Sequence, residues 1–272
     1  MNYFSVGITL LTLGLAAPGA VAQSDPGSSE PLRSAPLINL DDAALLNRGQ
    51  LSGHIDFRAF GGEEDLLYTS LGVHLGLGHN LEAAVRGSFA NRKTLPLPTG
   101  SAIRHGGSDV ELLARYRFLG GDPASSKPTV TGLVGVGLPS TPDRGSASLT
   151  LGLSASAALK HGAVLTLNPR AIFLSNNTLF GVGFGAHVHI ARGVSLLGDY
   201  TPLLSGGNTR STTDGALRSR DIYGAAIRLS SPDERISLDF GYTNGTGATT
   251  GFALTPGLGG SGAFYFAFTA RR

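Results

Sequence analysis

One stretch of the sequence constrains the fold more than any other. In residues 108–119 (SDVELLARYRFL) apolar and polar side chains alternate. The apolar set is Val110, Leu112, Ala114, Tyr116 and Phe118. The opposite set is Asp109, Glu111, Leu113, Arg115 and Arg117. A period of two indicates a β-strand with two unlike faces. The charged face either meets water on a half-buried sheet, or lines the lumen of a transmembrane barrel whose apolar face meets lipid.

The same alternation recurs along the rest of the chain from residue 51 onward, at about twelve places in all. Each segment has roughly 9 to 14 residues, the length that a tilted membrane strand needs. The segment 163–174 contains Pro169, which cannot donate a hydrogen bond to a neighbouring strand and is therefore a defect in the predicted ladder.

The lengths of the predicted connections depend on their position. Every second connection is short: residues 78–80, 120–127, 161–162, 191–193 and 231–234. The long connections, residues 91–107, 203–217 and 244–261, all belong to the other set. Bacterial outer-membrane barrels have short periplasmic turns and long outer loops. In lipid the sheet must also close on itself, because no backbone group can stay unpaired. The sequence therefore predicts an all-β fold, a single closed antiparallel up-and-down transmembrane β-barrel of about 12 strands over residues 51–272.

The first residues are typical of an export signal. An apolar run at residues 6–17 precedes the small residues Ala20 and Ala22. This pattern predicts a signal peptide over residues 1–22, cleaved before Gln23. Residues 23–50 are then a periplasmic tail or a small plug, and we expect the mature protein in the bacterial outer membrane.

Composition excludes several classes of function. The chain has no cysteine, so it forms no disulfide and no thiolate metal site. Its net charge of +2 gives no reason to expect nucleic-acid binding. No motif predicts a cofactor. The expected partners are outer-membrane lipids, a small-molecule solute and the barrel-assembly machinery, which reads terminal aromatic residues such as Phe264, Phe266 and Phe268.

Two adjoining passages resemble a known family. The first is GGSDVELLARYRFL and the second is VTGLVGVGLPSTPD. With Gly106, Asp109, Val110, Arg115, Tyr116, Arg117, Phe118, Leu138 and Pro139, they resemble the outer-membrane channels associated with the MetA pathway of phenol degradation. The resemblance implies a barrel and suggests passage of small hydrophobic or aromatic molecules. The last element departs from the family pattern, because Ser140-Thr141-Pro142 stands where Thr-Gly would be.

The polar faces of the predicted strands supply the candidate site. Candidates for lining or constricting the lumen are His54, Asp56, Arg58, Glu82, Arg86, Asp109, Glu111, Arg115, Arg117, Arg170, His187, His189, Asp199, Arg228 and Asp239. They either form a constriction that selects solutes or pair with one another to fill the barrel. His187 and His189 share a face and could bind a metal, but no third ligand is evident, so we predict lumen histidines and no metal.

These observations favour a passive channel or transporter over three alternatives. The first alternative is a closed structural or adhesive barrel that acts through its outer loops. The second is a lipid-processing hydrolase, but the chain has no Gly-x-Ser-x-Gly elbow and we expect no enzyme. The third is a soluble exported β-sandwich, which would not expose the outward aromatic residues Phe57, Tyr116, Phe184, Tyr200 and Phe240.

Overall fold

A computed structural model describes residues 37–272 except 63, 121–127, 140–146, 160–161 and 176. The predicted signal peptide and residues 23–36 of the predicted tail lie outside the described residues. So do most of the predicted short connections at 120–127 and 161–162.

Twelve long strands make up the fold in the described part of the chain. They are β1 (Leu51–Phe60), β2 (Leu66–Gly78), β3 (Leu81–Pro96), β4 (Ala102–Leu119), β5 (Thr129–Pro139), β6 (Ser148–Ala158), β7 (Ala163–Phe173), β8 (Thr178–Ala191), β9 (Val194–Thr201), β13 (Ile222–Ser230), β14 (Ile236–Thr243) and β15 (Ala263–Arg271). The short elements are β10 (Leu203–Ser205), β11 (Thr209–Arg210), β12 (Leu217–Arg218), the helix α2 (Thr250–Ala253) and the 3₁₀ turn η3 (Leu258–Gly260). None of the helices among the described residues is long and apolar enough to cross a membrane.

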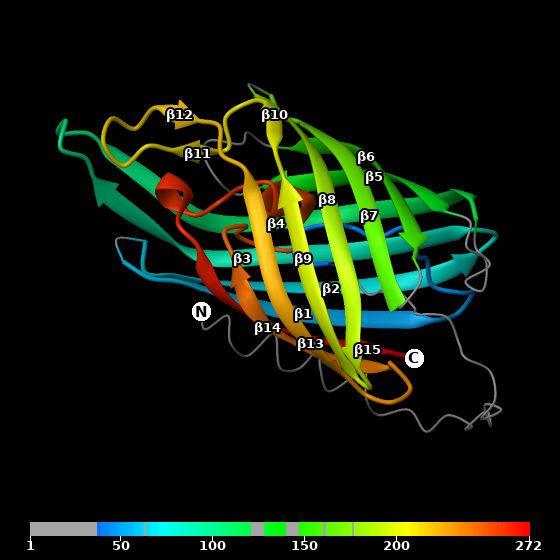
Figure 1. Ribbon diagram of the computed structural model, residues 1–272. Helices are drawn as coiled ribbons and strands as arrows, with labels where there is room; N and C mark the ends of the chain where they lie inside the picture. Colours follow the sequence, from blue (N-terminus) through cyan, green and yellow to red (C-terminus); the bar gives the residue numbers. More distant parts are fainter. Residues whose placement is uncertain (1–36, 63, 121–127, 140–146, 160–161, 176) are drawn as a thin grey trace, which may run out of the picture. The chain divides into compact units, whose positions relative to one another are not determined.

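The twelve strands form one closed ring (Figure 1). Each long strand pairs antiparallel with the next long strand along the chain. The last strand, β15, pairs with β1 from Ser52↔Arg271 to Phe60↔Ala263, so no long strand is left with an open edge. The prediction of a closed antiparallel barrel of about 12 strands is confirmed.

Strand β4 shows how the alternating sequence produces the two faces. Val110, Leu112 and Tyr116 are exposed on the outside, and Leu112 is 57% exposed. Asp109, Glu111 and Arg115 are buried on the inside. Leu113, the apolar residue on the polar face, is also inside, where it packs with Ala84 and Leu133. The outer surface of the barrel is consequently a band of exposed aliphatic and aromatic side chains on every long strand from β1 to β15.

The predicted long loop at residues 91–107 is wrong. Strand β3 continues to Pro96 and β4 begins at Ala102, so most of these residues extend the hairpin beyond the barrel wall. A bulge between Ala90 and Lys93 separates the two parts of the hairpin. Gly106 has φ +82° at this bulge, and a Cβ there would lie 2.2 Å from the carbonyl oxygen of Asn91, so the bulge needs glycine.

Pro169 interrupts the ladder between β6 and β7, as expected for a residue with no N–H. The pairing stops at Gly152↔Arg170 and resumes in the same register at Ala155↔Leu167. The side-chain amide of Asn168 donates to the carbonyl oxygen of Leu153 at 2.7 Å and so supplies a donor in the gap. The local defect therefore leaves the register of the barrel unchanged.

The outer band gives a test of the membrane environment. Arg in place of Leu112, at the middle of β4, is expected to lower the free energy of unfolding by about 2–4 kcal/mol in lipid vesicles, because a charge would then face hydrocarbon. Arg in place of Thr99, at the exposed tip of the β3–β4 hairpin, serves as the control. Urea titrations in vesicles measure both. Equal stability of the Leu112→Arg and Thr99→Arg variants would mean that this face does not contact lipid.

Candidate functional site

The predicted lumen residues all lie on the inner face of the barrel wall. The buried ones are Asp56, Arg58, Glu82, Arg86, Asp109, Glu111, Arg115, Arg170, His187, Asp199, Arg228 and Asp239. His54, Arg117 and His189 are half-buried. The interior is therefore polar and ionic along most strands, while the apolar residues of the same strands face outward.

Several of these charges pair across neighbouring strands because the strand register places them opposite each other. Arg228 opposes Asp239 and binds both carboxylate oxygens, each at 2.7 Å. Glu82 opposes Arg115 and accepts from it at 2.8 Å. Such bidentate and buried pairs compensate for the loss of water around each charge.

A larger share of the lumen charges bind a segment that precedes the barrel, residues 37–46, which we call the inner segment. Asn39 is at its centre. Its backbone N–H and side-chain amide donate to the two carboxylate oxygens of Asp199 at 2.9 and 2.8 Å. Its side-chain oxygen accepts from Arg58 at 2.8 Å, and Arg58 also donates to the carbonyl oxygen of Ile38 at 3.0 Å. One asparagine thus joins β9 to β1, which have three strands between them in the ring.

The two aspartates of the inner segment bind arginines of β3 and β4. Asp41 pairs with Arg86, and Arg115 donates to the carbonyl oxygen of Asp42. Burial alone would raise the pKa of Asp41, but the adjacent Arg86 and Arg115 hold that pKa well below its ordinary value of 3.8. Asp41 is therefore a carboxylate throughout the physiological pH range, and its ion pair persists there.

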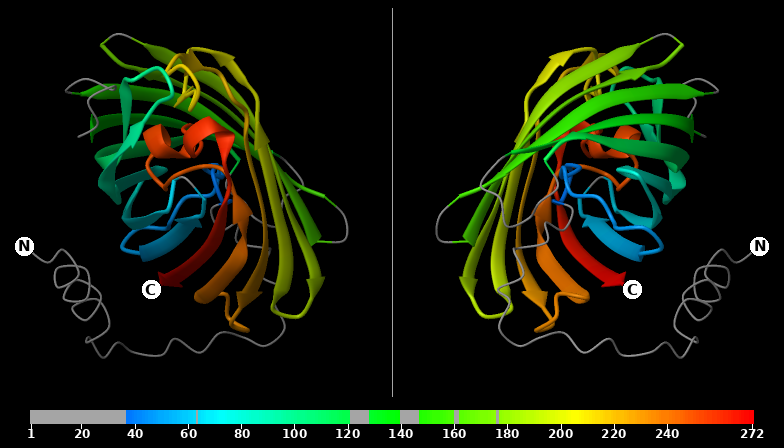
Figure 2. Two further views of the ribbon diagram at one scale, coloured as in Figure 1. Left: turned by 90° about the vertical axis from the view of Figure 1, so that its left-hand side faces the viewer. Right: turned by 90° about the vertical axis from the view of Figure 1, so that its right-hand side faces the viewer.

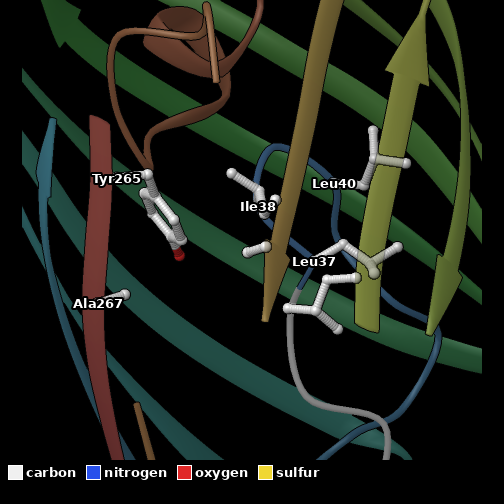
Figure 3. Close-up of a cluster of buried hydrophobic side chains, with 7 residues drawn as sticks. Leu37, Ile38, Leu40, Tyr265 and Ala267 are labelled. Carbon is white, nitrogen blue, oxygen red and sulfur yellow. The ribbon is translucent and has the colours of Figure 1, made fainter. Parts of the chain in front are cut away.

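Apolar contacts complete the docking of the inner segment. Leu37, Ile38 and Leu40 lie inside the barrel and pack against the inner face of its wall (Figure 3). With inward residues of the wall they form one buried cluster, whose other members are Leu197, Ala226, Tyr265 and Ala267.

Glycines on the inner face of β8 make room for the inner segment. A Cβ at Gly183 would lie 2.3 Å from Leu40, and one at Gly185 would lie 2.2 Å from Leu37. Any larger residue at these positions would therefore force the side chain of Leu40 or Leu37 to shift.

A second segment fills the other half of the lumen. The connection between β14 and β15, predicted as an outer loop, folds into the barrel and carries α2 (Figure 2). Thr249 caps α2 and donates to Asp109 at 3.0 Å. Thr250 donates to Glu111 through its backbone N–H at 3.0 Å and through its hydroxyl at 3.1 Å. Two wall carboxylates therefore bind this loop and do not line an open channel.

The same loop, residues 244–262, is anchored by apolar contacts and by a buried glutamate. Phe252 packs on Phe60 and Tyr68, and Leu254 packs on Ile172 and Leu179. Near the next turn Glu64 accepts from the backbone N–H of Leu258 at 3.1 Å and from Ser261 and His105. We call residues 244–262 the inner loop.

A cavity of about 390 Å³ remains between the two segments and the wall. Its deep part is lined by Arg86, Arg115 and Arg170, and Ala248 and Ala253 of the inner loop border it. Its other end is lined by Arg117, which contacts the β2–β3 turn at Asn80, and by Arg235, Arg271 and Arg272. The cavity therefore opens at the end of the barrel that carries the short turns and the last strand's C-terminus.

Two alternatives for this lumen are a hydrolase site and a metal site. The imidazole of His54 lies between Thr269 and Asp56, with each contact at 3.1 Å, which is the order that a hydrolase would need. The Thr269 hydroxyl is buried and borders a space of only about 10 Å³, too small for a substrate. His187 and His189 do not share a ligand set: His189 contacts Ser195, and no group of three or more His, Cys, Asp or Glu in the described residues could hold a metal ion.

The residues of the two filling segments were not predicted as site residues. Asn39, Asp41 and Asp42 lie in the segment predicted as a tail or a small plug, and Thr249 and Thr250 lie in a predicted outer loop. A usable signal was present in β8, where the inward positions Gly181, Gly183 and Gly185 carry no side chain. A wall face with three glycines in a row indicates that something other than wall side chains fills the space beside it.

Together, the closed ring, the apolar outer surface and the filled polar interior define a β-barrel of the type found among outer-membrane channels. Two solved structures are similar in fold. The NanC porin has a TM-score of 0.54 and 13% identity, over 82% of this chain and 99% of that one. An outer-membrane channel from Pseudomonas putida F1 has a TM-score of 0.51 and 14% identity, over 92% of this chain and 99% of that one.

No protein-family model matches the sequence, and no curated protein is significantly similar to it. At identities this low, the likeness to the two solved structures concerns the fold.

The glycines of β8 give a test of the inner segment. Val in place of Gly185 is expected to displace Leu37 and speed amide exchange at Asn39, Ala43 and Leu46 about tenfold, since overpacking costs about 1–3 kcal/mol. These three amides donate to side chains of the wall. Gly53→Val is the matched control, because a Cβ at Gly53 has nothing within 4 Å. Hydrogen exchange read by mass spectrometry measures the effect. Unchanged protection in Gly185→Val would contradict this packing.

Proposed function

We propose that the protein is a passive channel or transporter of the bacterial outer membrane for small solutes. The observation that carries this proposal is the pairing of an exposed apolar outer surface with a buried ionic interior in one closed ring. A water-soluble protein would not expose so continuous an apolar band. In lipid the sheet must close into a ring, because an open edge would leave backbone N–H and C=O groups without hydrogen-bond partners.

The proposed state of this channel is closed. The inner segment and the inner loop both bind wall charges that would otherwise line a passage. The cavity between the two segments and the wall is large enough for a small molecule. We propose that solutes pass when one or both segments leave the lumen, so that the predicted plug in residues 23–50 is its inner segment.

The nature of the solute is a further part of the proposal. The resemblance of residues 106–119 and 130–143 to channels associated with the MetA pathway suggests small hydrophobic or aromatic solutes. Of the residues that carry this resemblance, Asp109 and Arg115 face the lumen and contact the inner loop and the inner segment. Tyr116 is exposed on the outer surface.

The location is tested by cell fractionation with heat-modifiable gel mobility. We expect the mature protein in the outer-membrane fraction, migrating faster unheated than heated because the closed barrel resists detergent. Recovery from the soluble periplasm would overturn the proposal of an outer-membrane barrel.

Conduction is tested in planar bilayers with two variants. In the first, residues 37–46 are replaced by ten Gly and Ser residues. In the second, Thr249→Val and Thr250→Val are added, which removes the hydroxyl hydrogen bonds of the inner loop to Asp109 and Glu111. We expect low conductance for the wild type and an increase of several fold in the combined variant, because both fillings are then loosened.

An outcome with no current from the wild type or from either variant would favour the alternative function, a closed structural or adhesive barrel that acts through its outer loops. The heat-modifiable mobility of each variant serves as the control for folding.

A further inference from the structure

Arg170 differs from the other arginines of the lumen wall. It lies in β7, its side chain is 1% exposed, and its Nε and Nη2 atoms have no hydrogen-bond partner among the described residues. Arg58, Arg86 and Arg115 all donate to the inner segment. Since leaving donors of a buried guanidinium unsatisfied is costly, Arg170 is suited to bind an acceptor that enters from outside the chain.

The acids near Arg170 are already engaged. Its positive charge interacts electrostatically with Asp41, Asp199 and Glu111. Asp41 pairs with Arg86, both oxygens of Asp199 accept from Asn39, and Glu111 accepts from Thr250 and from Thr150. These carboxylates therefore balance the charge of Arg170 at a distance but do not occupy its donors.

Arg170 is among the residues that line the 390 Å³ cavity. Of the described residues that line this cavity, seven are arginines and three are aspartate or glutamate, so the lining carries an excess of positive charge. Arg115 and Arg117 line the same cavity as Arg170. Such a lining attracts anions and repels cations.

The lining around Arg170 also has an apolar part. Leu37 and Leu40 of the inner segment, Val164 of β7 and Ala253 of α2 border the same cavity. A guanidinium fork suits a carboxylate, which it can bind through two parallel hydrogen bonds. The apolar residues suit a compact hydrocarbon body attached to that carboxylate.

We propose that Arg170 forms the binding site for the carboxylate of a small amphipathic solute, which enters the cavity from the end of the barrel with the short turns. This inference deepens the proposed function and rests on it for the passage of the solute, whereas binding at Arg170 is measurable without any transport.

The test uses benzoate as the probe and the refolded full chain in detergent micelles. Binding is followed by isothermal titration calorimetry and by ¹⁹F NMR with fluorobenzoate. Benzyl alcohol has the same ring without the carboxylate, and inorganic phosphate has the charge without the ring. We expect benzoate to bind at least about tenfold more tightly than either of them, since each lacks one of the two contacts.

Three variants locate the binding site. Arg170→Gln is expected to weaken benzoate binding by about tenfold or more. Arg170→Lys keeps the charge that balances the nearby acids but loses the fork, and is expected to weaken binding by several fold. Arg192→Gln, in the exposed β8–β9 turn and outside the cavity, is expected to bind as the wild type does. Heat-modifiable mobility confirms that each variant is folded, and Arg170→Lys keeps the test usable if Arg170→Gln does not fold.

Each result decides the proposal. Weaker binding in each Arg170 variant that folds, with Arg192→Gln unchanged, supports the site. Equal binding by wild type and Arg170→Lys, equal binding of benzyl alcohol or phosphate, or no binding of benzoate to the wild type would overturn it. Benzoate binding without any conductance in bilayers would leave the site standing and remove the channel, and conductance without benzoate binding would do the reverse.

Discussion

The interior of this barrel depends on buried arginines finding acceptors. Four buried arginines each bind a carboxylate: Arg58, Arg86, Arg115 and Arg228. Three of these, Arg58, Arg86 and Arg115, bind the inner segment. A guanidinium held in a narrow lumen without such partners would be strongly unfavourable. The wall charges and the two filling segments therefore share one polar network.

The glycine content has a related explanation. The sequence holds 40 glycines, about double the average share. On the inner face of β8 they remove side chains where Leu37, Leu40 and Leu254 enter the lumen. The inner face of the wall thus carries charged side chains where the segments have polar groups, and glycines where the segments have leucines.

The fold was largely predictable and the interior was not. Alternation with a period of two identifies each strand of the wall and both its faces, because a strand's side chains point to opposite sides wherever it lies. The inner segment and the inner loop have no periodicity, and their positions depend on contacts with residues that are distant in the sequence, such as Asn39 with Asp199. The extension of β3 and β4 past Ala90 was missed because Pro96 and Pro98 read as a loop, although Pro96 ends the strand as an edge position allows.

The inner segment and the inner loop are attached to neighbouring strands of the ring. Residues 47–50 join the inner segment to β1, and the inner loop runs directly into β15, and these are the two strands whose pairing closes the barrel. The pairing of β1 with β15 therefore places the attachment points of both segments side by side. If this seam were unpaired, Asp56, Arg58 and Tyr265, which are buried in the closed ring, would lie on edge strands next to those attachment points.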